Sequence, residues 1–397
     1  MQAANRDPRR VVTRAGLMLA LAVAAGFSPW PAAAQQGARS IETVPGMPPV
    51  VDRSNLYSET RSDKLSPAAA NALPRVYVPN LKSNDVYVID PATLKVVDRF
   101  RVGINPQHIV PSYDLKTLWV TNNAEGRTDG SLTPVDPATG KPGKSIAVDD
   151  PYNMYFTPDG RSAIVVAEAL KRLDFRDPQT MALQSSLSAP QCGGINHADF
   201  SIDGRFVIFT CEFQGSLAKI DLVGRKVLGY LKLSRGTMPQ DIRVSPDGKT
   251  FYVADMKADG VFLIDGESFK ETGFIKTGVG THGLYPSRDG TRLYVANRGS
   301  NRIHGRPHGK GSVSVVDFAT GRIVATWPIR GGGSPDMGNV SVDGKVLWLS
   351  GRYDDVVYAI DTTSGKVRKI AVGKEPHGLT VWPQPGRYSL GHTGNMR

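Results

Sequence analysis

The chain has 397 residues, including 42 glycines and 28 prolines, and a formal net charge of +11. No long charged or apolar repeat runs through it, so its length fits two average domains or one large all-β domain. Only Cys192 and Cys211 occur and there is no C-x-x-C-H motif, which excludes covalent c-type haem attachment. The basic charge favours acidic partners, nucleic acid among them as a minor possibility, but net charge does not decide a fold.

Residues 1–34 have the pattern of an export signal. A basic start leads into the apolar run "AGLMLALAVAAGF", and Ala32-x-Ala34 offers a cleavage site before Gln35. The run is shorter than the roughly 20 residues that a membrane span needs, so we expect no transmembrane segment in the mature chain. The sequence therefore predicts a periplasmic or secreted protein, with the Sec and twin-arginine routes both open. Removing the signal leaves a net charge of about +8.

A strand of one kind recurs seven times after residue 73. Each copy is rich in β-branched and aromatic residues and is bounded by turn formers, as in "RVYVPN", "TLWVTN" and "RLYVAN". The copies occupy residues 75–80, 117–122, 162–168, 205–211, 250–256, 292–298 and 346–352. Because a fixed period indicates a repeat architecture, these copies set the organisation of the chain.

Other strands complete each unit. A second strand ends in an aspartate that can start a turn by bonding its own downstream backbone, and a third strand follows it. The aspartates are Asp90, Asp136, Asp177, Asp221, Asp265, Asp317 and Asp361. Before every recurring strand except the first lies an inner strand that ends in a tight turn, as in "DIRVSPDGK". Each unit is then four antiparallel strands over about 44 residues, the period of a propeller blade.

The count of strands closes the ring. The first unit lacks an inner strand, and a spare strand "HGLTVWP" at 377–383 follows the last complete unit. The sequence therefore predicts an all-β, seven-bladed β-propeller over 73–385, closed by a C-terminal strand that joins the first blade and removes two exposed edges. Residues 35–72 lack periodicity and predict a flexible arm, and residues 386–397 predict a tail that crosses one face. A monomer is expected.

The recurring "LYVAN" and "LWVTN" strands, with "VID" and "SPDG", resemble the YVTN-repeat family of seven-bladed β-propellers. A more distant likeness of fold links the chain to the propeller of nitrous oxide reductase, whose ring carries a histidine-ligated copper cluster. The electron-transfer domain of that enzyme has no counterpart in this sequence. The family includes lactonases and binding proteins, so the resemblance implies the fold and leaves the chemistry open.

Histidines recur at the start of alternate inner strands, seven or eight residues before the turn. They are His108, His197, His282 and His377, and the other blades offer Asn153, Asp241 and Asp336 at comparable points. Since inner strands line the central channel, we expect these side chains at one mouth of it. Imidazole ligates copper, zinc and iron, so one interpretation is a metal or metal-cofactor site, with copper or another transition metal. The plainer interpretation is that the histidines bond neighbouring backbone.

Charged residues end the recurring strands on the same face. Arg298 and Arg352 could hold a carboxylate or phosphate in bidentate fashion, although rim charges more often serve only solvation. His304 and His308 fall in the one long insertion, a basic loop expected over the same mouth, and His392 is expected to be inert. Cys192 and Cys211 are separated by little more than a hairpin, so a disulfide is expected, with thiolate ligation beside His197 as the alternative.

Three functions remain open at this stage. The first is a non-catalytic exported protein that binds a small ligand or protein partner at the channel mouth, through the histidines with Asp241, Asp336, Arg298 and Arg352. The second is a redox protein with a metal or haem-type cofactor held by His108, His197, His282 and His377. The third is a lactonase-like hydrolase, supported by fold analogy alone, and no catalytic residue is assigned.

Overall fold

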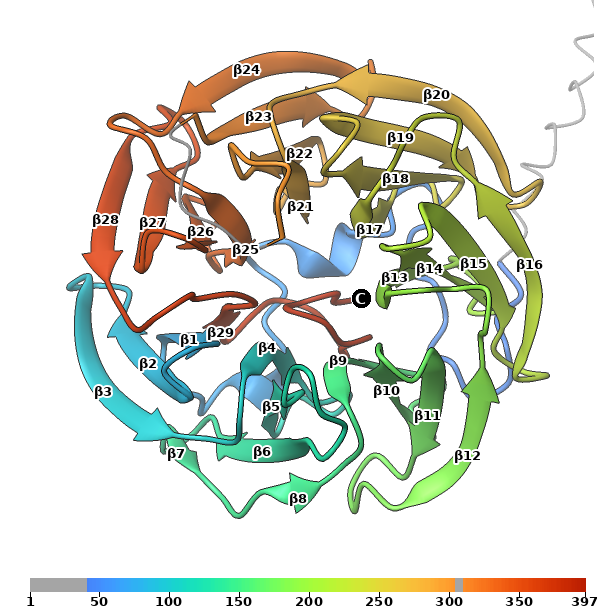
Figure 1. The fold of residues 1–397 in the computed structure, drawn as a ribbon, viewed down its shortest axis with the longest axis horizontal. Coiled ribbons are helices and arrows are strands. Elements are labelled where there is room, and N and C mark those ends of the chain that lie inside the picture. Colours follow the sequence, from blue (N-terminus) through green and yellow to red (C-terminus); the bar gives the residue numbers. More distant parts are fainter. Residues whose placement is uncertain (1–40, 304–309) are drawn as a thin grey trace, which may run out of the picture. The chain divides into compact units, whose positions relative to one another are not determined.

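The protein is an all-β ring of seven blades. A computed structural model describes residues 41–303 and 310–397. In these ranges seven separate sheets surround a central axis (Figure 1). The helical content described is two short 3₁₀ turns, η1 (Ser58–Thr60) and η2 (Pro67–Ala69). The seven-bladed propeller predicted from the repeat is thereby confirmed.

Each blade runs from an inner to an outer strand. The inner strands, in blade order from 1 to 7, are β29 (Thr380–Trp382), β4 (Pro106–Pro111), β9 (Pro151–Phe156), β13 (Ile195–Phe200), β17 (Pro239–Val244), β21 (Thr281–Pro286) and β25 (Pro335–Val340). The second strands are β1 (Arg75–Asn80), β5 (Leu118–Asn122), β10 (Ala163–Ala167), β14 (Phe206–Cys211), β18 (Thr250–Asp255), β22 (Arg292–Asn297) and β26 (Val346–Gly351).

The remaining strands complete the blades outward. The third strands are β2 (Asp85–Asp90), β6 (Ser131–Asp136), β11 (Arg172–Arg176), β15 (Ser216–Asp221), β19 (Gly260–Asp265), β23 (Ser312–Asp317) and β27 (Val356–Asp361). The outer strands are β3 (Lys95–Arg101), β12 (Leu183–Ser188), β16 (Lys226–Lys232), β20 (Lys270–Lys276), β24 (Arg322–Pro328) and β28 (Val367–Ala371), and in blade 2 two short pieces, β7 (Lys141–Pro142) and β8 (Ile146–Ala147).

The core lies between neighbouring blades. Successive side chains of a strand point to opposite faces of its sheet, so each blade packs against two neighbours. In β1, Val76 belongs to the apolar cluster shared with blade 7, whereas Tyr77 belongs to the cluster shared with blade 2. Outer strands alternate between exposed and half-buried positions because one of their faces meets solvent. The period-2 alternation of side chains along each strand therefore accounts for the packing of each blade against both of its neighbours.

The turn aspartates act as the sequence predicts. The carboxylate of Asp90 accepts a hydrogen bond from the backbone N–H of Ala92 at 2.9 Å, and Asp136 bonds Ala138 in the same way at 2.9 Å. These bonds fix the turn between the third and outer strands, because a short acceptor side chain can satisfy its own downstream backbone.

The ring is closed by strands from both ends of the propeller. β29 pairs antiparallel with β1, with Val76 opposite Val381 and Tyr77 opposite Thr380. The closing strand is shorter than expected, because the backbone at Gly378 diverts to blade 2 and forms a parallel bridge with His108. Closure through the C-terminal strand is confirmed, and it covers the edge of β1 that would otherwise be exposed.

Residues 41–72, expected as a flexible arm, are packed against the lower face, where the inner strands end. Leu56 and Tyr57 are 7% and 4% exposed, and the Tyr57 hydroxyl donates to the carbonyl of Val244 at 2.6 Å. The arm lacks periodicity because it is held by isolated anchors such as these and not by a regular element. The part of the arm at 35–40 lies outside the described residues.

Residues 386–397, expected as a tail across one face, instead enter the channel as a hairpin from the lower face. Leu390 N–H donates to the carbonyl of Asn395 at 2.7 Å, and Arg397 N–H donates to Tyr388 at 3.0 Å. The C-terminal end lies at the centre of the ring in Figure 1. The ring leaves an axial space with polar walls, and the hairpin fills it with bonds to several inner strands.

Candidate functional site

The inner strands begin with an irregularity that brings two consecutive residues toward the channel. In six of the seven, pairing with the second strand slips just after the first residue, as between Pro239 and Ile242. Such a bulge re-aims side chains without ending the strand. We call the residue after the first paired one the upper position and the next one, deeper in the channel, the lower position.

Upper positions hold an acid between two bases. They are Gln107, Tyr152, Asn196, Gln240, His282, Asp336 and His377. One carboxylate oxygen of Asp336 lies 2.8 Å from Nδ1 of His282 and the other lies 2.8 Å from Nδ1 of His377. Burial lowers the pKa of His282 to about 4 and that of His377 to about 3. The two rings are therefore oriented by a shared carboxylate.

Lower positions hold His108, Asn153, His197, Asp241, Gly283, Met337 and Gly378. Gly378 is needed here, because a Cβ on it would lie 2.0 Å from Nδ1 of His108. The His108 and His197 side chains are fully buried. Neither ring nitrogen of His108 has a hydrogen-bond partner, and Nε2 of His197 has none. This layer therefore contains polar groups that the described residues leave unsatisfied.

The hairpin tip adds a fifth histidine, His392, which the sequence predicts to be inert. His392 has a left-handed φ of 51° and is fully buried, and its N–H donates to the carbonyl of Met154 at 2.8 Å. A non-glycine residue held at positive φ is a strained position that often marks function. The Nδ2 atom of Asn153 lies 2.9 Å from Nδ1 of His392 and 3.2 Å from Nδ1 of His197.

The four histidines predicted from the repeat do converge. Ring centroids are 5.3 Å apart for His108 and His197, 6.3 Å for His197 and His282, 5.9 Å for His282 and His377, and 4.8 Å for His377 and His108. His392 lies 5.1 Å from His108 and 4.7 Å from His197 by the same measure. The histidines thus form one cluster in two layers.

Asp241 supports the lower layer. Its carboxylate accepts from Arg243 Nη1 at 2.8 Å and from the backbone N–H of Leu284 at 2.9 Å, and it lies 3.6 Å from Nε2 of His392. Burial raises the pKa of Asp241 to about 6. Its acceptor atoms are used within the protein, so we assign it a positioning role.

The mouth above the histidines carries charges of both signs on opposite sides. Glu168 and Glu212 directly follow the second strands of blades 3 and 4, and Arg298 and Arg352 directly follow those of blades 6 and 7. Glu212 accepts from the amides of Asn196 at 2.7 Å and Gln240 at 2.9 Å. Burial raises the pKa of both glutamates.

The two arginines differ in what they bind. Arg298 donates twice to Asp336, from Nη2 at 2.7 Å and from Nε at 3.1 Å. Arg352 is 5% exposed, and its Nε and Nη1 have no hydrogen-bond partner within the described ranges. Of these two arginines, Arg352 is therefore the one that offers unused donors at the mouth.

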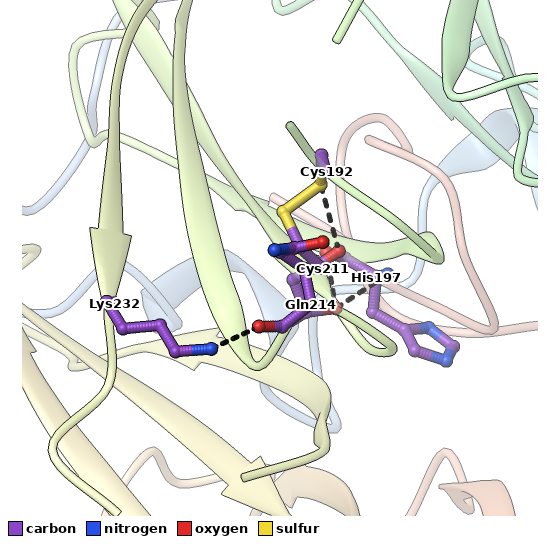
Figure 2. Close-up of a disulfide and its surroundings, with 6 residues drawn as sticks. Cys192, His197, Cys211, Gln214 and Lys232 are labelled. Carbon is purple, nitrogen blue, oxygen red and sulfur yellow. Dashed lines mark hydrogen bonds between the residues drawn. A yellow bond between two sulfur atoms is a disulfide. The ribbon is translucent and has the colours of Figure 1, made fainter. Parts of the chain in front are cut away.

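Cys192 and Cys211 are joined in a disulfide, which Figure 2 shows beside the start of β13. Neither cysteine is free, so the alternative of thiolate ligation beside His197 is wrong for this structure. The His197 ring points away from the two sulfur atoms, and its backbone N–H donates to Oγ1 of Thr210 at 3.0 Å. The covalent link holds the loop from which His197 enters the channel.

His304 and His308 of the insertion lie outside the described residues, and so do residues 1–34, for which the sequence predicts an export signal. Within the described ranges, no helix is long and apolar enough to cross a membrane.

Fold and site together define a seven-bladed β-propeller with a buried, histidine-rich channel. The chain belongs to the YNCE-like β-propeller family, whose sequence profile matches residues 35–385. No curated protein matches the chain.

Solved structures share the ring at low identity. The periplasmic gluconolactonase of Pseudomonas aeruginosa is 20% identical with a TM-score of 0.62, over 79% of this chain and 99% of that one. A protein of Bacteroides uniformis described as a putative 6-phosphogluconolactonase is 16% identical with a TM-score of 0.62, over 77% and 98%. Hydrazine synthase of Kuenenia stuttgartiensis is 18% identical with a TM-score of 0.58, over 77% and 98%. These likenesses concern the fold alone.

Proposed function

We propose that this propeller is an exported, non-catalytic binding protein that takes a small ligand with a carboxylate or phosphate group at the upper channel mouth. The observation that carries the proposal is the Arg352 guanidinium, which is buried with two unused donors. A buried donor without a partner is costly, and a planar guanidinium matches the two oxygens of a carboxylate or phosphate. The ligand supplies what the fold leaves unpaired.

The surrounding charges favour an anion at Arg352. Asp336 forms its ion pair with Arg298, so it does not neutralise the charge of Arg352. The rings of His282 and His377 are neutral near pH 7, because burial lowers their pKa and the charges of Arg298 and Arg352 lower it further. The glutamates on the opposite side suit a ligand that also carries a positive or hydroxyl group. Two side chains at the mouth are slightly exposed, Tyr152 at 8% and Glu212 at 6%, whereas the lower histidines are fully buried.

Export rests on separate features. The signal pattern of residues 1–34 predicts secretion, and a disulfide fits an oxidising compartment. The partner at the mouth is therefore a periplasmic or extracellular molecule.

The test is calorimetric titration of the mature protein with a panel of sugar acids, dicarboxylates and inorganic phosphate. We expect one compound to bind with 1:1 stoichiometry, and Arg352→Gln to weaken it by about 10-fold to 100-fold. The matched control is Arg368→Gln, which changes an exposed arginine of the same blade and leaves affinity unchanged. Equal binding by wild type and Arg352→Gln would contradict the proposal.

Catalysis is checked with the same protein. Because structures described as lactonases share the ring, we include gluconolactone and its 6-phosphate in the panel. The proposal predicts binding without turnover. Hydrolysis at a rate that falls in Arg352→Gln would replace it with the hydrolase alternative.

A further inference from the structure

Three imidazoles meet inside the channel below the mouth with unpaired nitrogen atoms. His108, His197 and His392 each offer a ring nitrogen within 4.8 Å of the other two. Both nitrogens of His108, and Nε2 of His197 and of His392, lack any hydrogen-bond partner among the described residues, and all three side chains are 0% exposed. Buried polar atoms are almost always paired, so a cluster of unpaired ones needs an explanation.

The three rings come from different parts of the chain. His108 and His197 hold lower positions in blades 2 and 4, and His392 reaches them at the tip of the hairpin that enters from the opposite face. Its positive φ and the close fit of Gly391, where a Cβ would lie 2.4 Å from Cα of Tyr155, show that the tip is fixed by its surroundings. The tip therefore holds the His392 imidazole at a fixed place beside the other two rings.

We propose that His108, His197 and His392 bind one transition-metal ion, with the C-terminal hairpin supplying the third ligand. A metal ion accepts a lone pair from each ring and so uses nitrogen atoms that the protein leaves unpaired. An all-nitrogen ligand set suits Zn²⁺, Cu²⁺, Co²⁺ or Ni²⁺, and not Mg²⁺ or Ca²⁺, which prefer oxygen.

Protonation does not compete with the metal at neutral pH. Burial lowers the pKa of all three rings well below the usual value, and neighbouring imidazoles lower it further. The rings are therefore neutral and carry the lone pair that ligation requires.

Asn153 contacts two of the three rings on their Nδ1 side. Its amide lies against Nδ1 of His197 and Nδ1 of His392. Ligation of a metal ion through Nε2 places a proton on each Nδ1. If the Asn153 amide turns its oxygen toward the two rings, that oxygen accepts a hydrogen bond from each Nδ1–H. The turn breaks the hydrogen bond that the oxygen now accepts from Met154 N–H. A carboxylate at this position would be the stronger acceptor.

His282 and His377 lie outside the ligand set. Neither belongs to the group of residues whose nitrogen atoms lie within 4.8 Å of one another, and Nε2 of His377 already lies 3.4 Å from the Tyr152 hydroxyl. This separates the proposed centre from the four-histidine set that the sequence indicated.

The test uses full-length mature protein stripped with a chelator and titrated with Zn²⁺, Co²⁺ and Cu²⁺ in a buffer without coordinating anions. We expect one ion per chain, visible Co²⁺ absorption bands, and nitrogen hyperfine structure in the Cu²⁺ electron paramagnetic resonance spectrum. His392→Asn, which tolerates positive φ, weakens Zn²⁺ binding by about 100-fold or more. Asn153→Asp retains or strengthens it.

Two controls locate the ion. The double variant His304→Ala/His308→Ala, in the basic insertion, leaves affinity unchanged, and His377→Gln still binds one ion. Loss of Zn²⁺ binding in the double variant would overturn the proposal. So would loss of binding in His377→Gln if His392→Asn still binds the ion.

A measurement on the wild type covers the case in which a variant fails to fold. With ¹⁵N-labelled histidine, Zn²⁺ should shift the imidazole nitrogen signals of three of the seven histidines. No shift at a Zn²⁺ concentration above that of the protein contradicts the proposal. The metal test is independent of the mouth ligand, because we expect Arg352→Gln to weaken anion binding and to leave the metal titration unchanged.

Discussion

Arg397 and Asp199 form a buried ion pair that holds the hairpin in the channel. Nη2 of Arg397 lies 2.7 Å from Oδ1 of Asp199 in β13, and the two side chains are 5% and 0% exposed. The amide of Asn395 donates to the same oxygen at 2.7 Å. The hairpin is thereby joined to blade 4, whose inner strand also carries His197.

Breaking this pair should loosen the hairpin. Arg397→Ala leaves the Asp199 carboxylate buried without its cation, which costs about 3 to 5 kcal/mol of unfolding free energy. Chemical denaturation measures the loss, and limited proteolysis should cut near residue 390 sooner than in wild type. Arg368→Ala, at an exposed site, is the control. Equal stability of the two variants would show that the pair is not an anchor.

Gly378 should resist any side chain. A Cβ there would lie 2.0 Å from Nδ1 of His108 and 2.9 Å from the carbonyl of Gln107. We expect Gly378→Ala to displace the His108 ring and to lower stability by about 1 to 3 kcal/mol, the usual cost of overpacking. The check is a denaturation curve together with a crystal structure of the variant. An unmoved His108 would contradict this account.

Ring closure should depend on β29. Val381 is 4% exposed and packs in the cluster between blades 7 and 1. Val381→Asp buries a charge in that cluster, so we expect a loss of at least about 3 kcal/mol and aggregation through the opened edges. Val324→Asp, on an outer strand at 52% exposure, is the matched control and should stay monomeric in light scattering.

The disulfide should contribute measurably to stability. The bridge spans 19 positions of sequence, and a loop of that size predicts about 3 kcal/mol of stabilisation through the unfolded chain. Cys192→Ala/Cys211→Ala should lose this amount. A reductant should destabilise the wild type and leave the double variant unaffected. A double variant as stable as the oxidised wild type would refute the expectation.

The raised pKa of Asp255 predicts that the stability of the protein depends on pH. Burial raises its pKa to about 6, so between about pH 4 and 6 the folded protein binds more protons than the unfolded chain. Stability from this group therefore falls as the pH rises through that window. Asp255→Asn keeps Oδ1 as acceptor for Met238, Lys257 and Ala258, and removes the charge.

The comparison for Asp255 is between pH profiles. Relative to wild type, Asp255→Asn should gain about 2 to 3 kcal/mol in unfolding free energy between pH 4 and pH 7, since one pKa unit corresponds to about 1.4 kcal/mol. Urea denaturation at several pH values measures this. Parallel profiles would mean that the folded and unfolded pKa values are equal.

The blades could be predicted because their signals are local. Alternating β-branched residues, turn aspartates such as Asp90, and turn glycines recur in register, and each acts within one or two strands. The spare strand at 377–383 predicted closure by the same count. The channel histidines followed from the register of the inner strands, without knowledge of any contact.

The layers and the hairpin were harder to predict. His197 precedes its turn glycine by seven residues and His282 by eight, and this single-residue difference is the sequence signal of the two layers. When the blades are aligned on their turns, the two spacings look like one position, so the layers are not separated. His392 gave no such signal, because its place depends on contacts with Met154, Asn153 and Asp241 that lie far away in the chain.

The bulge at the start of each irregular inner strand separates architecture from chemistry. The residues that it turns toward the axis are released from regular pairing, so the hydrogen bonds between the strands do not fix which side chains they carry. A ring of this kind can exchange its axial side chains blade by blade while its strands stay in register. Proteins that share one propeller fold can therefore differ in the side chains that line the central channel. In this chain a C-terminal segment from outside the blades also contributes to that lining.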